Sequence, residues 1–231
     1  MSGSTTINNH PSSAVLLDHA AGSLSFAHYC VVATHLLRCP DCRDAVSFWE
    51  KIGNARLAAA PPLQPPSGLL ERCLASIDRY EASRDSSPRP EAGPVRPEAL
   101  DGTILPPPLR SLKPGRLRWL APGIRHRTLW HDDRGTLHLI RVRPGVSLSA
   151  HRHRGLELTC VLGGAYRADG RRFDVGDLSE EEDDDEDNLR GERDHVVVAE
   201  PSSDCICIMA TTGRLRFSGW LARLFQPVMP F

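Results

Sequence analysis

The sequence of 231 residues predicts an α + β chain of two domains, a small amino-terminal helical bundle followed by an all-β jelly-roll barrel. Apolar residues recur at helical spacing near the amino terminus and with a period of two after about residue 109. Between these parts, from Pro61 to Pro108, lie eleven of the 19 prolines. We therefore expect domains over 1–82 and 109–231, joined by an extended linker over 83–108.

Helical periodicity predicts four helices before the linker. Val15 and Leu16 belong to a short helix that we expect to end near Gly22, a second helix covers about 26–39, and a third runs from 41 to 53. A fourth is expected over 67–82, where the apolar positions are Leu69, Leu70, Cys73, Leu74, Ile77 and Tyr80. The first three of these helices enclose only a small core, and a core of this size usually needs a further stabilising link, such as a metal ion, to fold alone.

Alternating apolar residues predict short strands after the linker. We expect them at 119–120, 136–142, 156–162, 195–199 and 205–211. Glycine or proline turns separate the strands at Pro122-Gly123, Pro144-Gly145, Gly163-Gly164 and Asp169-Gly170. Many short strands at this spacing indicate a barrel or jelly roll. A last helix over 215–225 is expected to cap the open edge of the barrel.

Composition excludes several classes of protein. There is neither an apolar run of membrane-spanning length nor a secretory signal, so we expect a cytoplasmic protein without a membrane partner, whose seven cysteines are thiols or thiolates. The net charge is −1, and removing the eight consecutive acids of 180–187 leaves +7 for the rest. This acidic run is typical of a solvated loop. No basic stripe alternates with aromatic residues, which argues against direct binding of nucleic acid.

The most informative segment is His35-Leu-Leu-Arg-Cys39-Pro-Asp-Cys42, which carries three soft metal ligands at close spacing. His35 and Cys39 are four residues apart and share one face of a helix. Pro40 favours a turn or a new helix start, which returns Cys42 to the same point. Zinc in structural sites takes four nitrogen or sulfur ligands in a closed tetrahedron, and this segment supplies three. A bound zinc would be the staple that the small helical core needs.

The fourth ligand must come from elsewhere in the chain. His10 is our candidate, since it lies twenty-five residues before His35. His19, which would share a helix with His10, and His28, seven residues before His35 on the same helix, compete for this position.

A second ligand cluster of different chemistry stands at His151, His153 and Glu157. Two histidines two residues apart on a strand face the same side, here the interior of the predicted barrel. With Gly145 and Gly164 the segment reads G-x5-H-x-H-x3-E-x6-G, which resembles the first motif of the cupins.

In cupins a later strand supplies one more histidine after a Gly-Asp turn. Gly176-Asp177 is the matching turn and His195 the matching ligand, although the acidic run lies between them and the usual proline and glycine are missing. Three imidazoles and one carboxylate would hold a divalent metal, zinc first, with iron, manganese or nickel also fitting.

A helical H…H-x3-C-x2-C module, a proline-rich linker and a carboxyl-terminal cupin together resemble the ChrR-type zinc-binding anti-sigma factors. The resemblance implies zinc at His10, His35, Cys39 and Cys42, and a sensitive thiol pair at Cys205-Ile-Cys207. It further implies that the helical domain binds a group IV (extracytoplasmic-function) sigma factor. The metallo-cupin would then release the sigma factor on sensing an oxidative signal such as singlet oxygen or organic peroxide.

Two other classes fit the same motifs. A cupin dioxygenase or isomerase with an accessory structural zinc would use iron held by three histidines and a glutamate to activate oxygen. The sequence shows no convincing separate acid–base pair for such an enzyme. A plain ligand-binding cupin with a structural zinc predicts neither turnover nor a sigma partner. The alternative to a sensitive thiol pair at Cys205 and Cys207 is two small apolar strand residues.

Overall fold

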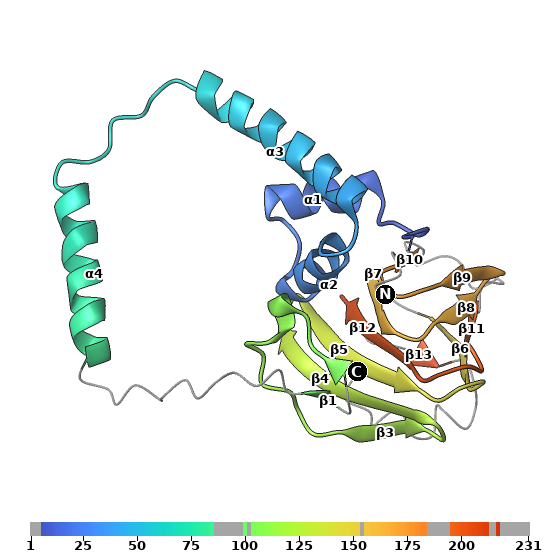
Figure 1. Ribbon diagram of the computed structural model, residues 1–231. Coiled ribbons are helices and arrows are strands. Elements are labelled where there is room, and N and C mark those ends of the chain that lie inside the picture. The colour runs from blue at the N-terminus through green and yellow to red at the C-terminus, as the bar shows by residue number, and fades with distance from the viewer. Residues whose placement is uncertain are drawn as a thin grey trace, which may run out of the picture.

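The computed structural model describes residues 6–85, 99–100, 103–152, 155–183, 195–212 and 216–217. Four helices precede the strands in the chain, as expected, and strands fill the second half (Figure 1). No helix among these residues is both long enough and apolar enough to cross a membrane. The helices are α1 (Ser13–Ala21), α2 (Phe26–Leu36), α3 (Pro40–Ala59) and α4 (Leu69–Asp85).

Local capping explains where the first helices begin and end. The Ser12 and Ser25 side chains accept hydrogen bonds from the backbone N–H groups of Val15 and His28, three residues on, which satisfies free donors in the first turns of α1 and α2. Gly22, with a φ of 70°, ends α1 in the left-handed conformation that glycine adopts most readily. The predicted end of this helix is confirmed.

Antiparallel strands form two larger sheets and one short hairpin. The hairpin pairs β1 (Ala99–Leu100) with β2 (Thr103–Ile104). The six-stranded sheet follows the order β10 (Leu178–Asp183), β7 (Gly155–Gly163), β12 (Cys205–Thr211), β5 (Gly135–Val142), β4 (Ile124–Asp132), β3 (Arg118–Ala121). The five-stranded sheet follows the order β13 (Arg216–Phe217), β6 (Ser147–Arg152), β11 (His195–Ala199), β8 (Tyr166–Ala168), β9 (Arg171–Phe173).

The combination of helices and antiparallel sheets is confirmed, but the predicted closed barrel is not. Within the described ranges each sheet ends in edge strands, and no strand is hydrogen-bonded to both sheets. Period-two alternation predicts which residues face inward, whereas closure depends on pairing between edge strands, which alternation does not encode. The result is two sheets whose inner residues line a shared pocket.

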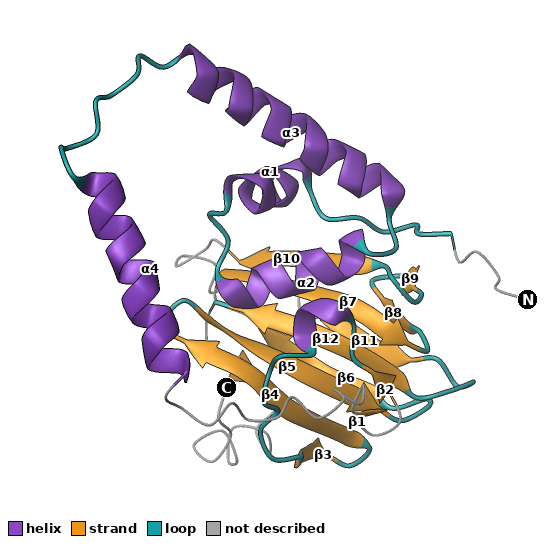
Figure 2. Ribbon diagram, turned by 60° about the vertical axis from the view of Figure 1, so that its left-hand side comes forward, coloured by secondary structure: helices purple, strands orange, loops and turns teal. Residues whose placement is uncertain are grey.

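Helix α2 joins the helical part to the six-stranded sheet. It packs against β5, β7 and β12 and against the 3-10 turn Pro107–Leu109 (Figure 2). Val31 and Val32 of α2 lie in the same buried cluster as Leu137 and Leu158 of the sheet. The face of α2 that the sequence assigns to a small helical core is therefore buried partly against the strands.

Helix α4 has the opposite environment. Its side chains are exposed through Ser83, and it stands apart from the other helices in Figure 1. The exposed apolar residues of α4 are Leu69, Leu70, Leu74, Ile77 and Tyr80. Helix α3 also exposes Phe48, Ile52 and Leu57.

Several predicted boundaries need correction. Helix α3 continues past Gly53 to Ala59. The position beside Gly53 is open, so no packing contact requires a glycine or a helix end there, and one glycine costs a helix only about 1 kcal/mol. Strands β4, β8, β9 and β10 were missed, and β6 was expected only as the strand that carries His151. Arg216 and Phe217 pair with β6 as a strand instead of starting the predicted helix, and 218–225 lie outside the described residues.

The linker and the acidic run also hold local structure. Within 83–108 the chain forms the β1–β2 hairpin and the 3-10 turn. The acidic run begins inside β10, so its first residues are paired in a sheet and do not form the expected loop, while 184–187 lie outside the described residues. The domain boundaries themselves stay predictions.

Candidate metal centre

One group of side chains among the described residues is arranged to hold a metal ion. It consists of His10, His35, Cys39 and Cys42, and their ligand atoms all lie within 4.8 Å of one another. The His10 Nδ1 atom is 3.3 Å from Cys39 Sγ and 3.4 Å from Cys42 Sγ, and His35 Nε2 is 3.3 Å from Cys42 Sγ. Two imidazoles and two thiols around one point match the donor set of a tetrahedral site.

The cluster forms where α2 ends and α3 begins. His35 lies in the last turn of α2, and the backbone N–H of Cys39 donates to the His35 carbonyl. Cys39 caps α3, accepting from the N–H of Cys42 through its sulfur, and Pro40 occupies the first turn as predicted. His10 approaches from the extended segment before α1.

The electrostatics of the cluster suit a cation. Burial lowers the pKa of His35, so the ring is neutral and able to ligate, although the bond to the Gly176 carbonyl opposes this shift. Burial, together with the hydrogen bond and charge of Cys39, raises the pKa of the Cys42 thiol to about 12. A metal ion reverses that preference, because it binds the thiolate and neutralises its charge.

The two competing histidines have other contacts. His19 stacks on Tyr29, with ring centroids 4.7 Å apart. His28 is buried, with Nδ1 2.6 Å from Ser25 Oγ and Nε2 3.0 Å from the Leu156 carbonyl oxygen. Of the three candidates for the fourth position, only His10 reaches the cluster.

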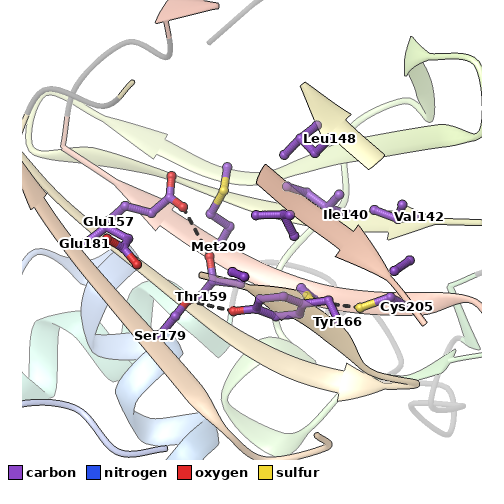
Figure 3. A pocket seen from close by; sticks show the side chains of 14 residues that line it. Ile140, Val142, Leu148, Glu157, Thr159, Tyr166, Ser179, Glu181, Cys205 and Met209 are labelled. Atoms are coloured by element: carbon purple, nitrogen blue, oxygen red, sulfur yellow. Dashed lines mark hydrogen bonds between the residues drawn. The ribbon is translucent and has the colours of Figure 1, made fainter. Parts of the chain in front are cut away.

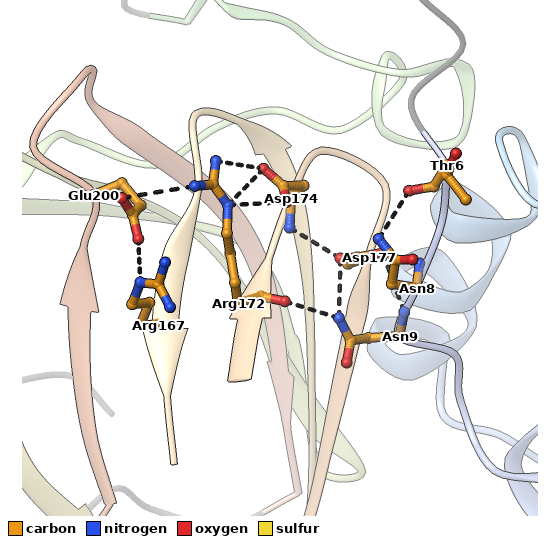
Figure 4. A network of polar contacts seen from close by, with 8 residues as sticks. All are labelled: Thr6, Asn8, Asn9, Arg167, Arg172, Asp174, Asp177 and Glu200. Carbon is orange, nitrogen blue, oxygen red and sulfur yellow. Dashed lines mark hydrogen bonds and ion pairs between the residues drawn. The ribbon is translucent and has the colours of Figure 1, made fainter. Parts of the chain in front are cut away.

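The cluster also contacts the turn before β10. His35 Nδ1 lies 2.7 Å from the Gly176 carbonyl oxygen. The neighbouring Asp177 is fully buried, and its carboxylate accepts from the backbone N–H groups of Asn8 and Asn9 and from the Asn9 side chain (Figure 4). This contact of a cupin-type turn with the first ligand cluster is not visible in the sequence.

The second predicted ligand set is described only in part. Glu157 is buried on β7 and lines the pocket between the two sheets. His151 of β6 and His195 of β11 stand directly opposite each other in the strand register. His153 lies outside the described residues. The fold therefore brings two of the predicted backbone positions together, while the ligand set remains a prediction.

The pocket beside Glu157 is largely apolar. Its polar lining includes Thr159, Ser179 and Glu181, and the Tyr166 hydroxyl is 2.8 Å from Ser179 Oγ (Figure 3). The full lining is Ile140, Val142, Leu148, Glu157, Thr159, Tyr166, Ala168, Ser179, Glu181, Val197, Ala199, Cys205, Cys207 and Met209.

The two cysteines of the predicted thiol pair also line this pocket. Their sulfur atoms are 3.5 Å apart, and both residues are buried. The hydrogen bond with Cys205, with burial adding to it, raises the pKa of the Cys207 thiol well above its ordinary value. In this state Cys207 is a protonated, weakly nucleophilic thiol.

Two buried histidines were missed by the sequence reasoning. His126 of β4 and His138 of β5 have ring centroids 5.7 Å apart. Burial lowers the pKa of His126 to about 4 and that of His138 to about 3, so both rings are neutral at pH 7. His138 lies two residues before Ile140 on a predicted strand and therefore shares its inward face, which was the available signal. His126 could not be placed, because β4 was not predicted.

Comparison with known proteins identifies relatives over nearly the whole chain. No protein family model matches the chain. The anti-sigma-E factor ChrR of Cereibacter sphaeroides is 35% identical over 222 residues, covering 96% of this chain and 98% of that protein. The crystal structure of Rhodobacter sphaeroides SigE in complex with the anti-sigma ChrR matches with a TM-score of 0.64 and 31% identity. That match covers 89% of this chain and 99% of the other.

The length and identity of the match with the Cereibacter protein rule out a similarity confined to one part of the fold, since it spans the helices and the strands alike. The resemblance stated from the motifs is thereby confirmed, and the chain belongs to the ChrR family of anti-sigma factors.

Proposed function

We propose that this protein binds an extracytoplasmic-function sigma factor through α3 and α4 and keeps it from RNA polymerase and promoter DNA. Family membership makes the chain a regulator and not an enzyme, which sets aside the dioxygenase and isomerase alternatives. The observation that carries the proposal is the exposed apolar surface of α4, formed by Leu69, Leu70, Leu74, Ile77 and Tyr80.

The chemistry of these helices supports a protein partner. An amphipathic helix normally buries its apolar stripe, and α4 leaves Leu70 67% and Tyr80 61% exposed. Exposed contiguous apolar residues of this kind mark interaction sites. The related ChrR is found with SigE, so a sigma factor is the occupant that we assign to this surface. Such a partner implies a cytoplasmic location.

We assign zinc to the cluster of His10, His35, Cys39 and Cys42. Two thiolates and two imidazoles favour zinc over harder divalent ions, and four protein ligands, three of them buried, are typical of a structural site. Bound there, the ion would tie the segment before α1 to the junction of α2 and α3. The helical surface offered to the sigma factor would depend on it.

We assign the sensing role to the pocket between the sheets. A divalent metal, zinc in our proposal, would be held by His151, His153, Glu157 and His195. The register of the two strand histidines and the burial of Glu157 support this set. An oxidant such as singlet oxygen or organic peroxide would act at this metal or at the Cys205–Cys207 pair, whose sulfurs are 3.5 Å apart, and release the sigma factor.

Co-purification tests the main proposal. The metal-loaded full chain is expressed with each extracytoplasmic-function sigma factor encoded by its host, and each pair is tested for a complex and for inhibition of sigma-dependent transcription. We expect one sigma factor to form a stable complex and to lose its activity. A full chain that binds and inhibits none of them overturns the proposal.

A further inference from the structure

The turn before β10 brings the sheet into direct contact with the metal cluster. The Gly176 carbonyl oxygen is a pure acceptor, so the Nδ1 atom of His35, 2.7 Å away, must carry the ring proton. The lone pair is then on Nε2, the nitrogen that lies 3.3 Å from Cys42 Sγ. One backbone carbonyl of the sheet thus fixes both the orientation and the tautomer of a metal-binding histidine.

Gly176 is held tightly at this contact. Its φ is 98°, in the region that favours glycine. A Cβ at this position would stand 2.5 Å from Ile7 Cδ1 and 2.9 Å from Arg38 Cδ. The carbonyl therefore approaches His35 only because the residue has no side chain.

Asp177 holds the extended segment that carries His10, the other histidine of the cluster. Its Oδ1 accepts from the N–H of Asn8 at 2.8 Å and of Asn9 at 3.2 Å, and its Oδ2 accepts from Asn9 Nδ2 at 3.0 Å. The N–H of Asp174 supplies a fourth bond to Oδ2 (Figure 4). The carboxylate is fully buried and accepts from these four neutral donors, three of which lie immediately before His10.

Further bonds extend the contact along β10. The N–H of Leu178 donates to the Asn9 carbonyl. The Glu180 carboxylate accepts from the N–H of Ser12 at 2.6 Å and from its hydroxyl at 2.8 Å. His10 therefore lies between two points of attachment to the same strand.

The two faces of β10 serve different sites. Successive side chains of a strand point to opposite faces. Leu178 and Glu180 face the helical part, whereas Ser179 and Glu181 line the pocket (Figure 3). A displacement of β10 caused in the pocket would therefore reach the metal cluster within one strand.

We propose that the Gly176 carbonyl and the Asp177 and Glu180 carboxylates of the sheet are positioning groups for the His10–His35–Cys39–Cys42 cluster, so that β10 couples metal retention to the pocket. This inference rests on the metal assigned under Proposed function. It goes beyond that assignment because it makes metal binding in the helical part depend on residues far away in the sequence.

The test uses the full chain loaded with Co²⁺. The sulfur-to-metal absorption of Co²⁺ arises only where a thiolate binds the ion, so it reports on the Cys39–Cys42 site and not on the second ligand set, which has no thiolate. The rate at which excess chelator removes this absorption is measured for Asp177→Asn. In Asp177→Asn an NH2 group replaces one carboxylate oxygen and faces two N–H donors that this oxygen had accepted from. We therefore expect the metal to be released about 10-fold faster than from the unaltered chain. Asp174→Asn is the matched control, because its side chain bonds to Arg172 and not to the amino-terminal segment, and its rate is expected to stay unchanged.

Hydrogen exchange separates positioning from a merely structural role. Coupling is reciprocal, so loading the metal must slow exchange at the N–H groups of Asn8, Asn9 and Asp174 in the unaltered protein. This measurement holds even where Asp177→Asn fails to fold. The substitution Glu180→Gln, at a half-buried position, is a second probe that leaves the Asp177 carboxylate in place, and we expect release to be about twofold faster.

The outcomes distinguish this inference from the metal assignment. The inference is overturned, and the metal assignment is kept, if two results are found together. The metal is released at the same rate from Asp177→Asn, Asp174→Asn and the unaltered chain, and hydrogen exchange is the same with and without metal. Absence of the thiolate–cobalt absorption from the unaltered chain removes the metal site itself, and the inference with it.

Discussion

Helices α2 and α4 have similar apolar spacing and opposite environments. Seven of the eleven residues of α2 are buried, in contact with three strands of the sheet. The described side chains of α4 are exposed, Leu74 and Ile77 to about half of their area. A periodic apolar stripe therefore indicates that one face of a helix will be buried, but it does not specify which partner buries that face. For α2 the partner is this chain, and for α4 we propose a second protein.

Removing the metal is expected to have the largest effect on this contrast. Excess chelator should cost the α1–α3 region several kcal/mol of stability, because binding of a structural zinc contributes directly to folding. Hydrogen exchange should accelerate in α1 and α3 and stay unchanged in α4, which supplies none of the four ligands. Added zinc should restore protection. Equal exchange with and without chelator would contradict a structural role for the metal.

Charges in the α4 stripe test the proposed sigma surface. Leu74→Glu with Ile77→Glu should weaken sigma binding about 100-fold or more, since buried apolar anchors dominate interfaces. Thermal unfolding of the free protein should not change, because both side chains are already exposed. The measurement is isothermal titration of the full chain with its sigma factor.

Ala75→Glu is the matched control for these charges. At 100° per residue, Ala75 lies on the opposite side of α4 from the stripe, and it is exposed as well. Sigma binding within about twofold of the unaltered protein is expected for this surface change. Equal loss in both variants would show that the stripe is not the contact face.

Truncating one apolar side chain on each helix measures the two environments directly. Val31→Ala in α2 removes two methyl groups from a fully buried site and should cost about 2 kcal/mol. Leu70→Ala in α4 should change the free energy of unfolding by less than about 0.5 kcal/mol. Denaturant unfolding of the full chain checks both values. A cost for Leu70→Ala as large as that for Val31→Ala would mean that α4 is packed in the free protein.

The smallest expected effect is a pH dependence at the contact of α2 with the sheet. Burial lowers the folded-state pKa of His28 below its ordinary value of 6.5, against the opposing effects of the Leu156 carbonyl and Glu157. Above pH 6.5 the ring is neutral in both states. Below it the unfolded chain binds protons first, so stability is lost as the pH falls. His28→Gln should flatten this loss between pH 7.5 and 5.5 in thermal unfolding, and an unchanged slope would exclude His28.

The first metal cluster was predictable because its ligands are close in sequence. A helix end, Pro40 and a CxxC spacing fix His35, Cys39 and Cys42 locally, and His10 was the first of three candidates for the fourth position. The second set was harder, because its ligands come from β6, β7 and β11, whose pairing is non-local. Strand β10 was missed since its acidic side chains have no apolar alternation.

The helices, most strands of the six-stranded sheet, the first ligand cluster and the family could be predicted, because they depend on local spacing and on matching residues along the chain. The packing of α2 on the sheet, the two separate sheets in place of one closed barrel, and the contact of Asp177 with the segment leading to His10 became visible in the three-dimensional fold. The physical reason is that burial and hydrogen bonding between residues about 170 positions apart leave no periodic trace in the sequence.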